Sequence, residues 1–224
     1  MKKNILFFLM ASALFSACMT MKNDIVIDRQ SEQMEKNLTK VESMIVPLEA
    51  AGGSEARARQ NEMSLVRQTI SDMEREASSD ADYSAKLTAW SGRLAILEGK
   101  YSEAQRLYRQ SIAASPGNIP SIVLGIRLEG DPAKRLENIN KELALSSGVG
   151  ELHIERGSVL AALNRFSEAA GAFDIAFSSG LNDVYAESYS TIRSRAWELR
   201  NTSGVGAGTL DMLIRDSVNW RDCI

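Results

Sequence analysis

The strongest constraint on this chain's fold is a set of six residues that recurs 65 positions later in the sequence. Most of the matched pairs keep their small or aromatic character. The first set is Gly92, Tyr101, Ala104, Tyr108, Ser111 and Pro116, and the second is Gly157, Phe166, Ala169, Phe173, Ala176 and Leu181. Two repeats of about 34 residues, one slightly shortened, produce such an offset, and repeats of that length are helix pairs. The spacing therefore predicts stacked helix pairs.

Composition agrees with a helical chain. The sequence holds only 4 prolines, 6% of its residues are aromatic, and Ala, Leu, Glu, Arg and Ser are abundant. These preferences favour helices over strands. We predict an all-α fold, a short helical-repeat solenoid that follows a cleaved leader.

The segments from Trp90 to Pro116 and from Arg156 to Ala176 resemble tetratricopeptide repeats. The resemblance implies a glycine on the first helix where the second helix of the same pair crosses closely, an aromatic residue filling the wedge of the pair, an alanine where backbones approach, and an aromatic residue plugging the gap to the next pair. These roles fall, in that order, on Gly92, Tyr101, Ala104 and Tyr108, and on Gly157, Phe166, Ala169 and Phe173.

Periodicity and breaker residues place further helices around this core. We expect a helix over 31–46 that ends at Pro47, and a second over 55–77. A weaker middle pair covers 119–128 and 133–145, with Asp131 as N-cap and Pro132 at the first helical position. Helices over 184–200 and 209–216 follow. The expected segments are residues 1–17 (leader), 18–29 (tether), 30–82 (helical hairpin, a diverged repeat or a cap), 83–183 (repeats) and 184–224 (C-terminal capping helices).

The N-terminus reads as a lipoprotein signal. Lys2 and Lys3 precede an apolar run, and Ser16-Ala17 places small residues directly before Cys18. The run is too short to span a bilayer, which needs about 20 apolar residues. We expect cleavage before Cys18 and lipid attachment to its sulfur; the alternative is an ordinary secretory signal cleaved nearby. The pattern resembles the lipoboxes of spirochaetes, so the chain resembles their tetratricopeptide lipoproteins.

Charge and chemistry-bearing residues exclude several function classes. The net charge is −3, and it becomes −5 without the leader because Lys2 and Lys3 are lost. A nucleic-acid binder carries a basic face, so we expect no nucleic-acid partner. His153 is the only histidine, which excludes a multi-histidine metal site and leaves no set of nucleophile and base. We expect no enzyme activity, no metal and no cofactor.

We expect a scaffold that binds protein or peptide partners in envelope assembly or transport. It would be anchored to the inner or outer membrane by lipid, on the periplasmic side. The alternative is a small-ligand or solute carrier associated with a transporter. A leftover thiol at Cys223 allows a homo-oligomer.

The resemblance to tetratricopeptide repeats implies partner binding on the wall built by the first helices of the pairs. We expect the charged heads of Arg93 and Arg195 to be exposed on that wall. The predicted partner-binding residues are Lys86, Arg93, Glu151, Ile154, Ser158, Tyr185, Ile192 and Arg195.

The signal yields a direct test at Cys18. A radioactive fatty acid fed to producing bacteria should label the wild-type protein, because acylation of the cysteine sulfur precedes cleavage of a lipoprotein signal. A Cys18→Ser variant should remain unlabelled, and equal labelling of both proteins would contradict the assignment.

Overall fold

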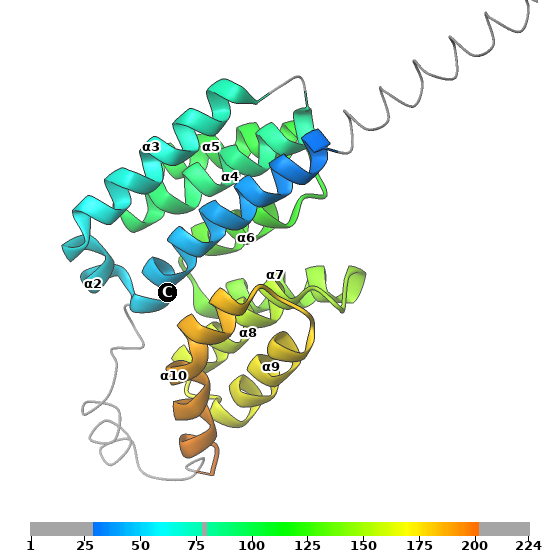
Figure 1. Ribbon diagram of the computed structural model, residues 1–224. Helices are drawn as coiled ribbons and strands as arrows, with labels where there is room; N and C mark the ends of the chain where they lie inside the picture. The colour runs from blue at the N-terminus through cyan, green and yellow to red at the C-terminus, as the bar shows by residue number, and fades with distance from the viewer. Residues whose placement is uncertain (1–28, 78–79, 202–224) are drawn as a thin grey trace, which may run out of the picture. The chain divides into compact units, whose positions relative to one another are not determined.

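The computed structural model describes residues 29–77 and 80–201, and every regular element within these ranges is an α-helix (Figure 1). A helix over residues 29–51 is followed by α2 (Gly53–Ala58), α3 (Gln60–Glu76), α4 (Ala81–Leu97), α5 (Tyr101–Ala114), α6 (Ile119–Leu128), α7 (Pro132–Leu145), α8 (Gly150–Ala162), α9 (Phe166–Ser178) and α10 (Asp183–Leu199). Among these described residues, none of the helices combines the length and apolarity that crossing a membrane requires.

The chain divides into two units, residues 1–39 and 40–224. In the first unit, residues 29–39 are helical and carry interactions between side chains one turn apart. The Lys36 ammonium lies 2.6 Å from the Glu32 carboxylate, and the Gln33 amide donates to Asn37 at 3.0 Å. Such exposed pairs support a helix by a few tenths of a kcal/mol each.

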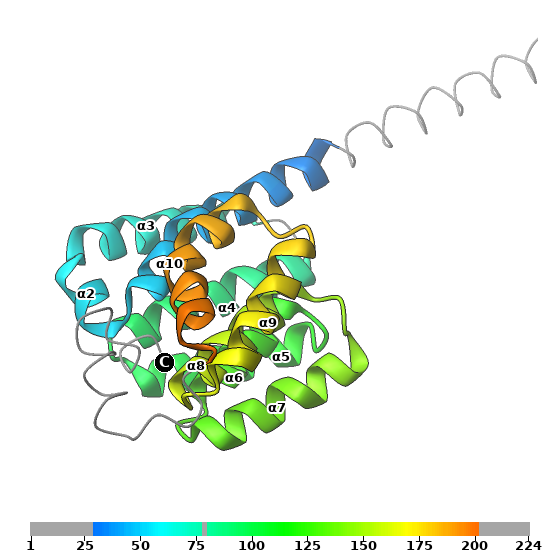
Figure 2. The ribbon, with the colours of Figure 1, turned by 90° about the horizontal axis from the view of Figure 1, so that it is seen from below.

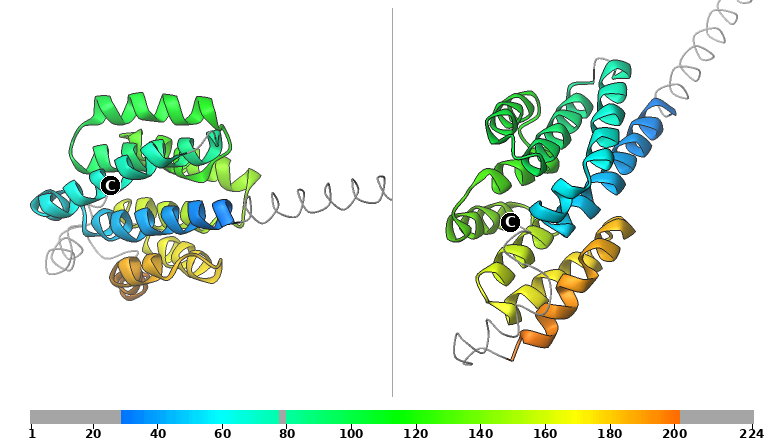
Figure 3. Two further views of the ribbon diagram at one scale, coloured as in Figure 1. Left: turned by 45° about the horizontal axis from the view of Figure 1, so that its top comes forward. Right: turned by 90° about the vertical axis from the view of Figure 1, so that its left-hand side faces the viewer.

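In the second unit, consecutive helices pack as pairs (Figures 1 and 3). Helix α4 packs on α5 and α8 packs on α9, while α5, α7 and α9 each also pack on the helix that follows them. The first helices of successive pairs touch one another, so α4, α6, α8 and α10 form a continuous row. We call these four helices the first-helix row.

The turns inside the pairs α4–α5 and α8–α9 are built alike. Gly99 and its counterpart Asn164 both adopt positive φ, 75° and 58°. The next residue in each turn donates its backbone N–H to a carbonyl five residues back, at 2.8 Å in both. Glycine and asparagine tolerate this left-handed backbone better than other residues, which explains both residue types.

The small and aromatic residues of the 65-residue pattern lie at close helix contacts. Ala104 and Ala169 are fully buried. A Cβ added at Gly157 would lie 2.8 Å from the Phe173 ring, so only glycine lets that ring approach the backbone. The Phe173 ring also lies 6.3 Å from the Tyr189 ring of α10, which confirms that it bridges to the next helix. Gly92 differs from expectation, because its close neighbour is Leu124 of α6, not its own partner helix.

Tyr101 does not fill a wedge, which corrects the expectation for its position. It is 59% exposed, whereas its counterpart Phe166 is 4% exposed. The difference follows from helix length: α10 has 17 residues and reaches Phe166 with its last turn, at Leu199, whereas α6 has only 10 residues. The helix after α5 is therefore too short to cover Tyr101.

Two predicted helix boundaries are wrong. The first helix continues through Pro47 to residue 51, because the turn after the proline is buried: Leu48 and Glu49 are almost fully covered. The predicted helix over 55–77 is broken at Arg59, whose N–H donates to the Ala56 carbonyl at 2.9 Å. No glycine or proline marks that break in the sequence.

Other boundaries are confirmed. The Asp131 carboxylate caps α7 by accepting from the Ala133 N–H at 2.8 Å, with Pro132 in the first turn. Helices α6 and α10 lie within one residue of their predicted ends. Cys18, Cys223 and the predicted helix over 209–216 lie outside the described residues.

The Phe173 contact predicts a large effect on stability. Phe173→Ala should lower the free energy of unfolding by about 3–5 kcal/mol, because a fully buried ring is lost and its cavity cannot collapse. Denaturant unfolding measures this. Ile175→Ala on the same helix is the matched control, since Ile175 is 46% exposed, and equal losses in both variants would contradict the packing role.

Candidate functional site

Three of the predicted partner-binding residues, Arg93, Glu151 and Tyr185, lie near one another at the centre of the second unit. They do not form an open surface. The segment 40–51 of the N-terminal helix contributes Glu49, whose side chain is 0% exposed between the arginines of two row helices. We call Glu49, Arg93, Arg127, Glu151 and Glu155 the charged cluster.

Glu49 receives charge-assisted hydrogen bonds from two helices. The Arg93 guanidinium on α4 meets it as a fork, Nε to Oε1 at 2.8 Å and Nη2 to Oε2 at 2.6 Å. The Arg127 Nη1 atom on α6 lies 2.6 Å from Oε1. Two-pronged arginine–carboxylate contacts fix relative orientation as well as distance. Segment 40–51 is therefore held in one register against α4 and α6.

Helix α8 completes the charged cluster. The Arg93 Nη1 atom lies 3.1 Å from Glu151, and the Arg127 Nη2 atom lies 2.5 Å from Glu155. Arg93 also stacks over the Trp90 ring at 3.8 Å from its centroid. Every charge in the cluster therefore meets an opposite charge, as burial requires.

The charges of the cluster shift the acidity of its members. Burial acts to raise the pKa of Glu49, but the charges of Arg127 and Arg93 outweigh it and lower that pKa overall. Burial raises the pKa values of Tyr185 and Tyr189 on α10, so both phenols stay neutral at physiological pH.

A second carboxylate of the N-terminal helix contacts the start of α10. Asn182, the N-cap of α10, donates its side-chain amide to Glu42 at 3.2 Å. Burial and then the charge of Glu151 raise the pKa of Glu42, because both disfavour its ionised form. Segment 40–51 therefore meets the first-helix row at both ends, through Glu42 and Glu49.

The structure corrects the expected exposure of Arg93. Its side chain is 1% exposed, so its guanidinium belongs to the interior and not to a free wall. The Arg195 side chain is partly exposed and pairs with Glu198 at 2.7 Å, one turn along α10.

The other predicted positions divide by burial. Ile154 and Ile192 are buried. Lys86 is half-buried and pairs with Asp82 at 2.7 Å, and the Ser158 hydroxyl donates to the Ile154 carbonyl at 3.0 Å.

Sequence reasoning missed Glu49, Arg127 and Glu155 as members of one cluster. Each of Glu49, Arg93 and Arg127 is a lone charge within a short apolar run, such as Val46-Pro-Leu-Glu-Ala-Ala51. A lone charge inside a buried stripe demands a partner, which is a usable signal. The signal does not say which distant residue supplies the partner.

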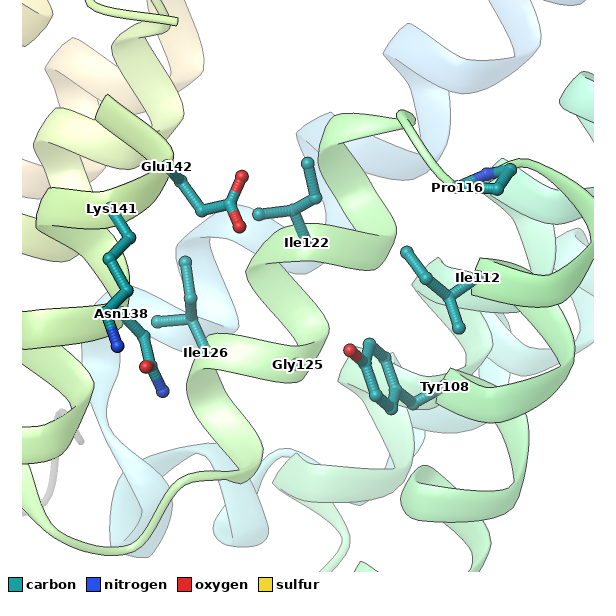
Figure 4. A pocket seen from close by; sticks show the side chains of 9 residues that line it. All are labelled: Tyr108, Ile112, Pro116, Ile122, Gly125, Ile126, Asn138, Lys141 and Glu142. Atoms are coloured by element: carbon teal, nitrogen blue, oxygen red, sulfur yellow. The ribbon is translucent and has the colours of Figure 1, made fainter. Parts of the chain in front are cut away.

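A separate groove opens beside α6, between α5 and α7 (Figure 4). Its volume is about 240 Å³. Figure 4 shows isoleucines of α6 along its floor, with Tyr108 beside Gly125 on one side and the polar residues of α7 on the other. The lining residues are Tyr108, Ile112, Pro116, Ile122, Gly125, Ile126, Asn138, Lys141 and Glu142.

The groove follows from the way α7 is placed. Helix α7 packs chiefly against α8 and touches α6 only slightly, unlike the closely packed pairs α4–α5 and α8–α9. One side of α6 is therefore left without its partner helix. Ile122 remains partly accessible there as a result.

Other candidate chemistry finds structural explanations. In residues 29–77 and 80–201, no group of three or more His, Cys, Asp or Glu side chains is arranged to hold a metal ion. The His153 Nε2 atom lies 2.9 Å from the Ser147 carbonyl oxygen, so this ring ties down the turn before α8.

Comparison with known proteins returned no match to a protein-family model, to a curated protein or to a solved structure.

The charged cluster predicts that Arg93 supports folding. Arg93→Ala should lower the free energy of unfolding by about 3–5 kcal/mol, because it removes one partner of a fully buried carboxylate. The matched control Arg195→Ala should lose less than about 1 kcal/mol, since its ion pair is partly exposed. Chemical denaturation measures both, and similar losses would refute the distinction.

The raised pKa of Glu42 predicts that Glu42→Gln increases the free energy of unfolding, and that the increase depends on pH. A carboxyl whose pKa is higher in the folded state destabilises the fold once it ionises, so at pH 7 the glutamine variant should be more stable, by up to about 1 kcal/mol. The gain in stability should vanish when the pH falls below 4.5, the ordinary pKa of a glutamate, because wild-type Glu42 is then protonated in both the folded and the unfolded state.

Thermal melts across pH 3.5–8 measure the effect of Glu42→Gln. The control Glu137→Gln should give no gain at neutral pH, because the hydrogen bond from Lys141 lowers the pKa of Glu137. A gain from Glu42→Gln that is independent of pH would contradict the electrostatic cause.

Proposed function

We propose that this protein is a non-enzymatic, lipid-anchored scaffold of tetratricopeptide-like helix pairs that faces the periplasm and binds protein or peptide partners of the envelope. The consecutive packing of helix pairs and the matching turns of α4–α5 and α8–α9 support the repeat assignment. The signal ending at Cys18 supports the anchor.

The groove beside α6 is the observation that carries the binding role. Its floor is apolar, through Ile122 and Ile126, and the helix α7 provides amide, ammonium and carboxylate groups along one edge. Sites that bind peptides and small ligands combine an apolar base with a few polar groups that set orientation. An extended or helical segment can insert apolar side chains and hydrogen-bond to Asn138 at the edge.

The size of the groove favours a peptide over a whole small-molecule ligand. At about 240 Å³ it falls below the span of roughly 300–1,000 Å³ typical of drug-sized ligands. It suits individual apolar side chains of a longer partner. The solute-carrier alternative would require a more enclosed cavity.

Photo-crosslinking in the envelope tests this proposal. A photoreactive residue at Asn138, on the groove edge, should give an adduct with one defined envelope protein. Ile122→Asp should abolish the adduct, because apolar side chains that cover a carboxylate on the floor would remove its hydration. The matched control position is Gln105, exposed on α5, which should give no such adduct. Circular dichroism should show Ile122→Asp to be folded.

The contrary outcomes are distinct. An adduct formed equally from Gln105, or one that persists in Ile122→Asp, would place binding elsewhere. A stoichiometric small molecule detected by native mass spectrometry and lost in Ile122→Asp would favour the carrier.

A further inference from the structure

Segment 40–51 is buried in the second unit, where its carboxylates contact the first-helix row. Its apolar face includes Val41, Ile45, Val46 and Leu48, each 0% exposed, with the equally buried Glu49 beside it. It contacts α4 and α6 through Glu49 and the N-cap of α10 through Glu42. Figure 2 shows it on the side of α6 that faces away from α7. The groove beside α6 is therefore a different surface.

The row keeps its charges paired without this helix. Arg93 pairs with Glu151 and Arg127 pairs with Glu155, in both cases across two row helices. Removing segment 40–51 would expose two hydrated ion pairs, with no unmatched charge. Glu49 in turn would regain water, whose loss is the main cost of burying it.

The electrostatic part of the contact is therefore close to balanced, and the apolar face supplies most of the attraction. The carboxylate adds selectivity. A helix with lysine in place of Glu49 would put a third cation between two guanidinium groups. A helix with alanine there would leave the Nε and Nη2 atoms of Arg93 without their carboxylate acceptor. The contact recognises an amphipathic helix with one carboxylate in a defined place.

We propose that the first-helix row is a binding site for an amphipathic α-helix of a protein partner, with apolar residues spaced as Val41, Ile45 and Leu48 are and a carboxylate directly after the last of them. Segment 40–51 is its built-in occupant, which a partner helix displaces. This second surface and its regulation are independent of binding in the groove.

Exchange of the occupant in a nicked protein tests the proposal. A protease site is inserted between the N-terminal helix and α2, at Gly52–Gly53, in the full chain. After cleavage the helix is held only by its contacts, so a fluorescent peptide of residues 37–52 should replace it and raise the fluorescence anisotropy. The intact chain should bind the peptide at least 10-fold more weakly, because its tethered helix competes at an effective concentration near millimolar.

Competing peptides test the chemistry of recognition. Unlabelled wild-type peptide should displace the probe, and the Glu49→Ala peptide should be at least 10-fold weaker. A Ser43→Ala peptide is the matched control and should compete as the wild type does, since Ser43 is exposed. If the folded, nicked protein binds no probe, or if the Glu49→Ala peptide competes equally, the proposal is wrong.

A second variant covers the case in which the inserted site prevents folding. Ile45→Ala in the intact chain weakens the built-in helix and leaves the charged cluster unchanged. It should bind the wild-type peptide at least 10-fold more tightly than the wild-type chain does. No gain in affinity would overturn the proposal, while the crosslinking result at Asn138 would stand unaffected.

Discussion

The position of segment 40–51 on the first-helix row depends on one buried carboxylate. Glu49 brings segment 40–51, α4 and α6 together through the guanidinium groups of Arg93 and Arg127, and these in turn reach α8 through Glu151 and Glu155. Buried ion pairs add little net stability compared with apolar packing, but they penalise every arrangement that leaves a charge unmatched. A shift of one residue turns a helix by about 100° and would remove Glu49 from both arginines. The cluster therefore selects one register.

The placement of α7 has an equally wide effect. A helix pair normally buries the face between its members. Helix α7 packs mainly against α8 and only slightly against α6, so part of the α6 surface stays exposed. Gly130-Asp131-Pro132 permits this, since Asp131 caps α7 and Pro132 starts it without continuing α6. The same ten-residue length of α6 that leaves Tyr101 uncovered also limits how far α7 can pack along it. The exposure of Tyr101 and the open side of α6 therefore both come from the middle helix pair, where the repeat pattern in the sequence is weakest.

Sequence reasoning succeeded where local physics decides. The 65-residue offset located both closely packed pairs, and Asp131-Pro132 located the start of α7 because capping is a short-range interaction. It failed where distant contacts decide: the turn after Pro47 is helical because Leu48 and Glu49 are buried, and Arg93 is interior because Glu49, 44 residues away, is there to meet it. The groove was missed because it opens only when α7 packs against α8 and not against α6. The hydrophobic periodicity of the sequence does not indicate which of the two helices α7 packs against.

The two surfaces differ in what they can discriminate. The groove beside α6 offers apolar contact with polar groups at an edge, and such sites accept many segments of suitable shape, because an added or missing methylene changes affinity only modestly. The first-helix row surrounds a buried carboxylate with fixed guanidinium groups, so a helix without that carboxylate loses a two-pronged charge-assisted contact that water cannot replace in a closed interface. Under the proposed roles, the row would select its partner helix strictly and the groove would accept a wider range of segments. A chain in which both proposed sites operate would hold one defined helix on the row and accept varied segments in the groove.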